Sequence, residues 1–154
     1  MAIAENTTLV RRFYEEVINS RALDAIDGMV ATTFVHNGEA RGPSGQRQAI
    51  QEILAAFPDV RVAIDDVVAE GDRVVARQTW RGTHQGTFMG IAPTGRSATW
   101  TGTATLRLAD GQIAQAWVNE DDLGLLRQLG RWSRRERLDN GASRPRATAP
   151  ICRS

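Results

Sequence analysis

Asp121 is the residue whose type and position best suit it to proton transfer. It stands at the end of the alternating segment 112–120, in phase with Trp117 and Asn119. Aromatic and aliphatic neighbours remove water from a carboxylate, and this loss raises its pKa toward the range useful for moving protons near neutral pH. We therefore predict Asp121 as the catalytic acid or base and place Asp122 on the opposite side. The competing interpretation is that either aspartate simply caps the turn that follows.

Several other polar and aromatic residues fall on segments that look like pocket walls. Gln78, Trp80 and His84 share one face of a strand pattern, whereas His36 and Asn37 lie on a shorter strand near the helices. Each has an ordinary alternative, because a lone histidine is often a surface or core residue and tryptophans usually fill cores. A flat aromatic ligand would nonetheless suit such walls. The predicted substrate-binding residues are His36, Asn37, Gln78, Trp80, His84, Trp100, Trp117 and Asn119.

The sequence offers no pattern for a metal or an organic cofactor. His36 and His84 are the only histidines, Cys152 is the only cysteine, and none of them falls in a metal-ligand spacing. The loop 90–97 has Arg96 where a phosphate loop needs lysine, and no Gly-x-Gly-x-x-Gly motif follows a strand. No serine lies in a Gly-x-Ser-x-Gly elbow. We therefore expect chemistry without metal or cofactor.

The elements that must position these residues begin with helices. Apolar residues recur at helical spacing over 9–18, and a second, shorter helix is expected over 23–30. A third helix ends before Pro58, which cannot continue it. The expected caps are Asn6 or Thr7 for the first helix and Ser44 for the third.

After Pro58 the apolar residues alternate with a period of about 2, which indicates strands. The expected strands are 60–65, 73–84, 97–108 and 112–120, joined by turns at 70–72 and 109–111 and by a loop at 85–95. Helices followed by a run of hairpin-linked strands predict an α+β fold, with the N-terminal helices packed on a mostly antiparallel sheet. Such a sheet can curl around the helices into a half-open cone that has a pocket between its layers.

The chain has the length of one domain, and its charge is distributed unevenly. Seven of the 19 basic residues, all arginines, lie in 131–154 beside only two acidic residues. We predict a domain over 1–132 and a basic, disordered tail over 133–154 that folding does not need. A basic tail could contact nucleic acid, but this one is short and almost free of aromatic residues. We therefore expect no nucleic-acid partner.

The sequence also bears on location. No apolar run reaches the roughly 18–20 residues of a membrane helix, and the N-terminus has neither a basic start nor an apolar stretch. We therefore expect a cytoplasmic protein with no membrane partner.

One face of the predicted sheet is poor in charge. Strands 97–108 and 112–120 present threonines, alanines and Val118 on their expected outer side. Because a charge-poor sheet face usually needs cover, we predict a homodimer packed sheet to sheet.

Three segments carry a family signal: TLVRRFYEEVIN at 8–19, GTHQGTFMGIAPTG at 82–95 and DDLGLLRQLG at 121–130. In this order they resemble the SnoaL-like family over about residues 7–130. The resemblance implies the cone-shaped α+β barrel that this family shares with ketosteroid isomerase and nuclear transport factor folds. The family includes cyclases that close the last ring of aromatic polyketides by an intramolecular aldol step, without metal or cofactor. It also includes relatives tied to hydroxylation of anthracycline-type rings.

The resemblance also carries over to single residues. The acid/base carboxylate of the cyclases matches Asp121, three residues before Gly124. The cyclases have a histidine two residues before that carboxylate and another near position 107, where this chain has Asn119 and Arg107. Arg107 thereby joins the expected binding residues, and both departures leave room for the hydroxylase-like branch. Three functions stay open: a cofactor-free cyclase or hydroxylase acting on an aromatic polyketide, a non-catalytic binding or dimerisation module, and an epoxide or ester hydrolase.

Overall fold

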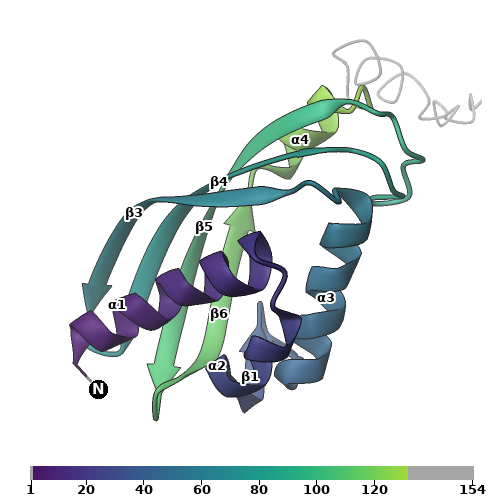
Figure 1. Cartoon of the computed structure of the whole chain (residues 1–154). Coiled ribbons are helices and arrows are strands. Elements are labelled where there is room, and N and C mark those ends of the chain that lie inside the picture. The colour runs from purple at the N-terminus through teal and green to yellow at the C-terminus, as the bar shows by residue number, and fades with distance from the viewer. Residues whose placement is uncertain (1, 132–154) are drawn as a thin grey trace, which may run out of the picture.

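A six-stranded sheet is the framework of the fold, and helices cover one of its faces (Figure 1). The computed structural model describes residues 2–131. The strands are β1 (Val30–His36), β2 (Glu39–Ala40), β3 (Arg61–Glu70), β4 (Arg73–Thr83), β5 (Ser97–Ala109) and β6 (Gln112–Glu120). They lie in the order β2–β1–β6–β5–β4–β3, and each neighbouring pair is antiparallel except β1–β6, which is parallel. The predicted α+β cone, with helices on a mostly antiparallel sheet, is confirmed.

The helices approach the sheet from its concave side. They are α1 (Ile3–Arg12), the π-helical segment η1 (Phe13–Asn19), the short 3-10 helix η2 (Leu23–Ala25), α2 (Ile26–Met29), α3 (Gly42–Ala56) and α4 (Asp122–Gln128). α1 packs on β3 and β4, whereas α3 packs against β1 and α4 against β5 (Figure 1). The predicted first helix is therefore one continuous rod whose second half widens into π geometry.

The predicted helix caps are wrong. α1 begins after Ala2, so Asn6 and Thr7 lie inside the helix, and Asn6 is buried. α3 begins after Arg41, which places Ser44 within the helix and not at its cap. Neither Ala2 nor Arg41 makes a side-chain capping hydrogen bond. Both helices extend farther toward the N-terminus than their apolar pattern, because exposed polar residues can continue a helix that is anchored elsewhere.

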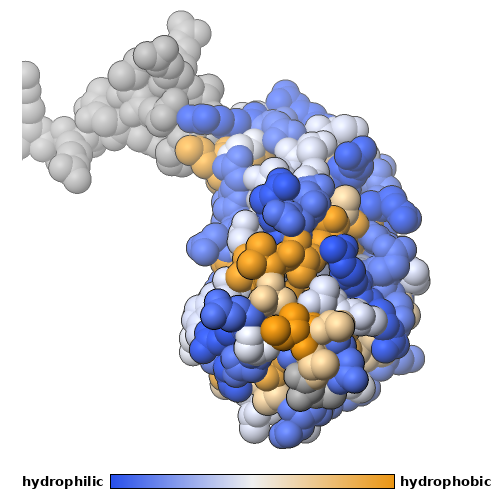
Figure 2. Space-filling model, turned by 90° about the vertical axis from the view of Figure 1, so that its left-hand side faces the viewer, coloured by the Kyte–Doolittle hydropathy of each residue, from blue (hydrophilic) through white to orange (hydrophobic). Residues whose placement is uncertain are grey.

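The β3 edge of the sheet lies beside the first helical rod. The Asn19 side chain binds both backbone groups of Val62, donating to the carbonyl at 2.9 Å and accepting from the N–H at 2.9 Å. These bonds occupy part of a strand edge that is otherwise open to pairing. Figure 2 views the side formed by β3 and the N-terminal end of α1, and it shows apolar side chains in a strip between hydrophilic ones.

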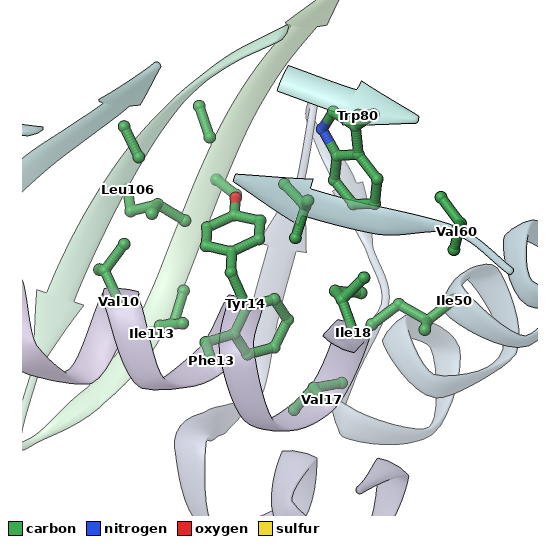
Figure 3. Packing of buried hydrophobic residues seen from close by; sticks show 14 of the residues in the cluster. Val10, Phe13, Tyr14, Val17, Ile18, Ile50, Val60, Trp80, Leu106 and Ile113 are labelled. Atoms are coloured by element: carbon green, nitrogen blue, oxygen red, sulfur yellow. The ribbon is translucent and has the colours of Figure 1, made fainter. Parts of the chain in front are cut away.

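The core lies between the inner face of the sheet and the helices. Trp80 of β4 and Trp100 of β5 are directly paired, and their rings stack at 6.3 Å between centroids. Phe57, which follows α3, packs against Trp100 at 5.0 Å. Tyr14 of η1 meets the edge of Trp80 at 6.4 Å, and Figure 3 shows its hydroxyl pointing from the helix toward the sheet. This aromatic cluster joins η1, the end of α3 and the strands β4 and β5.

A β-bulge interrupts the regular alternation of β6. Ile113 and Gln115 oppose two consecutive residues of β5, Leu108 and Arg107, so Ala114 is an extra residue. One extra residue shifts the two-residue alternation of side chains and sends the rest of the strand to the other face. The bulge therefore decides which residues of β6 reach the interior.

The phase predicted for β6 is wrong beyond this bulge. Ala116, Val118 and Glu120 face the interior, whereas Trp117 and Asn119 face outward. Val118 consequently does not belong to the outer face on which the sheet-to-sheet dimer was predicted. By contrast, the predicted boundaries of the last three strands agree with β4 to β6, whereas β3 continues to Glu70, five residues beyond its predicted end at 65.

Two predictions concern segments beyond the sheet. Within residues 2–131, no helix is long and apolar enough to cross a membrane. The predicted basic tail, 133–154, lies outside the described residues.

Candidate functional site

A cavity of about 290 Å³ lies between η1, α3 and the inner face of the sheet. Its walls are mostly apolar, and side chains such as Phe13, Ile50 and Leu106 contribute to them. The volume is at the lower end of the range of about 300–1,000 Å³ for small-molecule sites. Its polar lining forms two groups. The Glu120 group comprises Tyr14, Gln78, Trp80, Glu120 and Asp122, and the Arg41 group comprises His36, Asn37, Arg41 and Gln46.

Sheet register places Glu120 and Gln78 on either side of a glycine. Gln78 of β4 pairs with Gly102 of β5, and Gly102 pairs with Glu120 of β6. A Cβ atom on residue 102 would come within 3.1 Å of Glu120 Cγ. The missing side chain therefore gives the Glu120 carboxylate room to lean across the sheet toward Gln78.

The environment of Glu120 favours its protonated form. Burial raises the pKa of this carboxyl, the neighbouring Asp122 carboxylate raises it further, and the indole of Trp100 partly opposes the rise. The side chain remains accessible to solvent at the pocket mouth, yet the surrounding protein removes enough water to disfavour the charge. A carboxyl with a raised pKa is a stronger base when ionised and gives up a proton less readily when neutral.

A buried amide lies beside this carboxyl. Gln78 is 1% exposed, and its Oε1 accepts a hydrogen bond from Trp80 Nε1 at 2.8 Å. An indole can only donate, so this bond fixes which end of the amide faces Trp80. Gln78 Nε2 is buried without a hydrogen-bond partner among the described residues. Leaving a buried donor unpaired costs about 1–3 kcal/mol, so this nitrogen is a candidate contact for a ligand oxygen.

Tyr14 completes the Glu120 group from the helix side. Burial raises the pKa of its phenol, the nearby Gln78 amide opposes the rise, and the Glu120 charge adds to it. The hydroxyl therefore stays protonated and can donate a hydrogen bond. Figure 3 shows Tyr14 and Trp80 within the same part of the core, with the Tyr14 hydroxyl directed at the sheet.

Asp121 is not placed in the pocket. Its side chain caps α4, because Oδ1 accepts a hydrogen bond from the Gly124 N–H at 2.9 Å. Any Cβ atom at Gly124 would collide with this carboxylate, which explains the glycine. The expected position of Asp121 beside Trp117 and Asn119 in a pocket wall is therefore wrong. Its catalytic role, which the family resemblance suggested, stays a prediction that this geometry does not favour.

Three further predicted site residues lie on the outer face of the sheet. Trp117 and Asn119 point away from the cavity because of the bulge at Ala114. Arg107 alternates with the buried residues of β5 and faces the same way. The guanidinium of Arg73 lies 5.2 Å from the centre of the Trp117 ring, which indicates a cation–π contact on this outer surface. None of the three lines the cavity.

His84 and Trp100 belong to the core beside the cavity and do not line it. His84 is fully buried, and its Nδ1 accepts a hydrogen bond from the Thr94 N–H at 3.2 Å. Its backbone also bonds to Gly95 and Arg96, so His84 fastens both ends of the loop that follows β4. Its position is that of a structural residue.

The predicted residues of the short strand do line the cavity. Asn37 uses both side-chain polar atoms on the backbone of Val118, accepting at 2.7 Å and donating at 3.2 Å, so it extends the β1–β6 pairing. His36 retains more freedom, because its Nδ1 has no hydrogen-bond partner among the described residues. Burial and the positive charge of Arg41 lower the pKa of His36. The imidazole is therefore mainly neutral near neutral pH.

The structure thus brings together Gln78, Trp80, His36 and Asn37 from the predicted set. It adds Glu120 and Tyr14, which sequence reasoning missed. A β-bulge leaves little trace in sequence, so strand phase alone could not identify Glu120. In the sequence, Tyr14 occupies one more apolar position of the first helix. Only its contacts in the folded structure indicate a polar role.

Within residues 2–131, no three His, Cys, Asp or Glu side chains converge as a metal site.

A family model for SnoaL-like polyketide cyclases matches residues 8–129, which is most of the chain. The protein belongs to this SnoaL-like family. No curated protein matches it.

Solved structures agree with this assignment. TsrD from Streptomyces laurentii is 32% identical, with a TM-score of 0.80 over 86% of this chain and 99% of that one. AclR from Streptomyces galilaeus, described as a proposed hydroxylase, is 28% identical, with a TM-score of 0.76 over 86% and 100% of the chains. IdmH from Streptomyces antibioticus, described as a proposed polyketide cyclase, is 31% identical, with a TM-score of 0.73 over 81% and 98%. The family therefore contains both kinds of proposed enzyme.

Proposed function

We propose that this protein is a cofactor-independent enzyme that moves a proton at an acidic carbon of an aromatic polyketide of the anthracycline type. The observation that carries the proposal is the position of Glu120, a carboxyl with a raised pKa at the wall of an apolar cavity. Abstraction of a proton next to a carbonyl near neutral pH needs a base whose pKa is raised toward that pH. The indole of Trp80 and the apolar side chains that line the cavity suit a flat ring system.

The first step is formation of an enolate. Ionised Glu120 takes a proton from the carbon between or beside the substrate carbonyls, and the C–H electron pair moves to form the enolate. The developing negative charge on oxygen is stabilised by donors aimed at it. Gln78 Nε2 supplies an amide donor without a partner, and the protonated Tyr14 hydroxyl supplies a second. Trp80 acts as a positioning residue because it holds the far end of the amide.

The second step is ring closure. The enolate carbon attacks an internal carbonyl carbon, which forms one C–C bond and leaves an alkoxide. Protonated Glu120 then returns its proton to that alkoxide, so the carboxylate is regenerated and atoms balance without a co-reactant. A mostly apolar cavity favours this step by holding the substrate in a folded conformation.

Hydroxylation is the second candidate, and the likeness to AclR favours it. It shares the first step, after which the enolate or phenolate carbon adds dioxygen to form a hydroperoxide. A two-electron reductant such as a thiol then cleaves the O–O bond, which leaves one oxygen atom as the hydroxyl group and releases the other as water. Arg107 and Asn119, the two departures from the cyclase pattern, lie on the outer face of the sheet. They therefore do not bear on the choice between the two reactions.

One experiment distinguishes cyclisation from hydroxylation. The purified protein is incubated with anthracycline precursors and an excess of a thiol reductant under air and under argon, and the products are followed by mass spectrometry. We expect a product isomeric with the substrate or lighter by water, formed equally in both atmospheres, if the reaction is cyclisation. A product heavier by one oxygen and formed only in air assigns hydroxylation. Recovery of unchanged precursor in both atmospheres, with binding intact, would contradict the enzyme proposal in favour of a binding module.

A further inference from the structure

The Arg41 group occupies a part of the cavity that the proposed proton transfer does not use. His36 ends β1, and Arg41 follows the short strand β2, immediately before α3 (Figure 1). Both side chains line the cavity together with Gln46 of α3. They bring donors to a site whose other end carries the carboxylates of Glu120 and Asp122.

The guanidinium of Arg41 is incompletely satisfied. Its side chain is 23% exposed, and only one described residue accepts a hydrogen bond from it, Gln46 Oε1 at 3.2 Å. Glu39 Oε2 is 3.9 Å from Nε, and that carboxylate is 74% exposed. A guanidinium has five N–H donors, and a partly buried positive charge is costly unless it is paired. The arrangement therefore has room for a further acceptor that carries negative charge.

Sheet register gives the separation between the two ends of the cavity. His36 of β1 pairs with Ala116 of β6, and the two strands run parallel. Glu120 lies four residues farther along β6, which corresponds to about 13 Å at a rise of roughly 3.3 Å per residue. A ligand that reaches both ends must therefore be elongated.

We propose that the Arg41 group binds a carboxylate of the substrate and so holds the acidic carbon at the Glu120 end. The substrate class is then an elongated aromatic acid with its carboxylate on the order of 10 Å from the reacting carbon. The planar guanidinium group of Arg41 can donate two parallel hydrogen bonds to the two oxygens of a carboxylate. The neutral imidazole of His36 can donate one more hydrogen bond. The carboxylates of Glu120 and Asp122 repel an anion, which sets a single orientation. The choice of reacting carbon rests on the proposed function, whereas the binding of an acid does not.

The test compares two inert probes of the same shape, naphthoate and methyl naphthoate. Their dissociation constants are measured by isothermal titration calorimetry at neutral pH with the full chain. We expect the acid to bind about tenfold more tightly than the ester, because charge-assisted hydrogen bonds are roughly twice as strong as neutral ones. Arg41→Gln should abolish this preference and leave the affinity for the ester within about twofold.

Arg47→Gln is the matched control. Arg47 lies on α3 and is 29% exposed, but it pairs with Asp24 and Asp27 and does not line the cavity. Arg47→Gln removes the same charge six residues farther along the chain, so the preference for the acid should persist. Glu39→Gln provides a second, non-disruptive variant, because it removes the exposed carboxylate that competes for Arg41. It should strengthen binding of the acid and not that of the ester.

Equal binding of acid and ester by the unmodified protein would overturn the proposal. So would an equal loss of preference in Arg41→Gln and Arg47→Gln, since the effect would then be one of net charge. Glu120→Gln should keep or increase the preference for the acid, because one repelling carboxylate is gone. Loss of turnover in that variant with acid binding intact would support the proton-transfer proposal and this one independently.

Discussion

At the scale of single residues, two adjacent carboxylates have different positions. Glu120 faces the cavity, and Asp121 turns away to cap α4. The sequence analysis predicted Asp121 as the base, with a cap at Asp121 or Asp122 as the competing interpretation, and it did not consider Glu120. Strand phase could not identify Glu120, because its inward position depends on a bulge six residues earlier.

The raised pKa of Glu120 predicts how stability depends on pH. A carboxyl whose pKa is higher in the folded state adds stability below its unfolded pKa, and that stability is lost as pH rises through the folded pKa. Glu120→Gln removes the ionised group and its repulsion by Asp122. We therefore expect the variant to have a higher Tm than the unmodified protein at neutral pH, with the difference shrinking in acid.

Thermal unfolding followed by circular dichroism across that pH range measures this effect. Glu52→Gln is the control, because Glu52 is an exposed residue of α3 away from the cavity. A lower Tm for Glu120→Gln at neutral pH would contradict the environment described for this carboxyl.

At the scale of elements, strand boundaries were more predictable than strand phase. Alternation and the Asp110-Gly111 turn locate β5 and β6 closely, because Gly111 has the positive φ of 74° that such a turn requires. The inward face of β5, with Trp100 and Gly102, also follows from alternation. Phase fails in β6 because Ala114 is a small residue whose extra place in the strand has no sequence signature.

The cap of α4 predicts different effects for two substitutions at one position. Asp121→Ala removes the acceptor for the Gly124 N–H and should lower the free energy of unfolding by about 1 kcal/mol. Asp121→Asn keeps a capping oxygen and should cost less than half as much. Urea unfolding at equilibrium measures both. Equal stability of the alanine variant and the unmodified protein would show that the cap contributes nothing.

At the scale of the whole molecule, the outer face of the sheet carries exposed side chains from several strands. Thr99, Thr101 and Thr103 of β5 are exposed there, and Val68 of β3 is 62% exposed. The pairing of Thr103 with Arg77 and Asn119 places it near the middle of this face. We propose that a second copy of the chain covers the face, which the sequence pattern already predicted from the threonines.

Thr103→Glu tests that proposal. In a symmetric dimer packed on this face, the longer side chain would lie between the two sheets, and the neighbouring Arg77 can balance its charge but cannot remove its bulk. We expect the unmodified protein to sediment as a dimer at micromolar concentration and the variant as a monomer. Gln51→Glu adds the same charge on the exposed side of α3 and should leave the dimer intact. A monomeric unmodified protein would refute the expected interface.

The family and the cone follow from sequence because three motifs and the α+β order extend over the whole domain. The site does not follow, because it depends on contacts between elements that are distant in the chain. Gln78, Gly102 and Glu120 come together only through sheet register, and Tyr14 joins them from the first helix. No local pattern encodes that meeting point.

The most direct test of the central claim is hydrogen–deuterium exchange at the acidic carbon of an aromatic polyketide analogue that lacks an internal electrophile. Exchange in deuterated water is followed by proton NMR with the unmodified protein, Glu120→Gln and Asp121→Asn. A positioned base contributes about 10²–10⁴-fold, so Glu120→Gln should slow exchange by that factor, and Asp121→Asn should change it by less than about tenfold. Exchange that is slowed by Asp121→Asn and preserved in Glu120→Gln would contradict the account and return the proton-transfer role to Asp121.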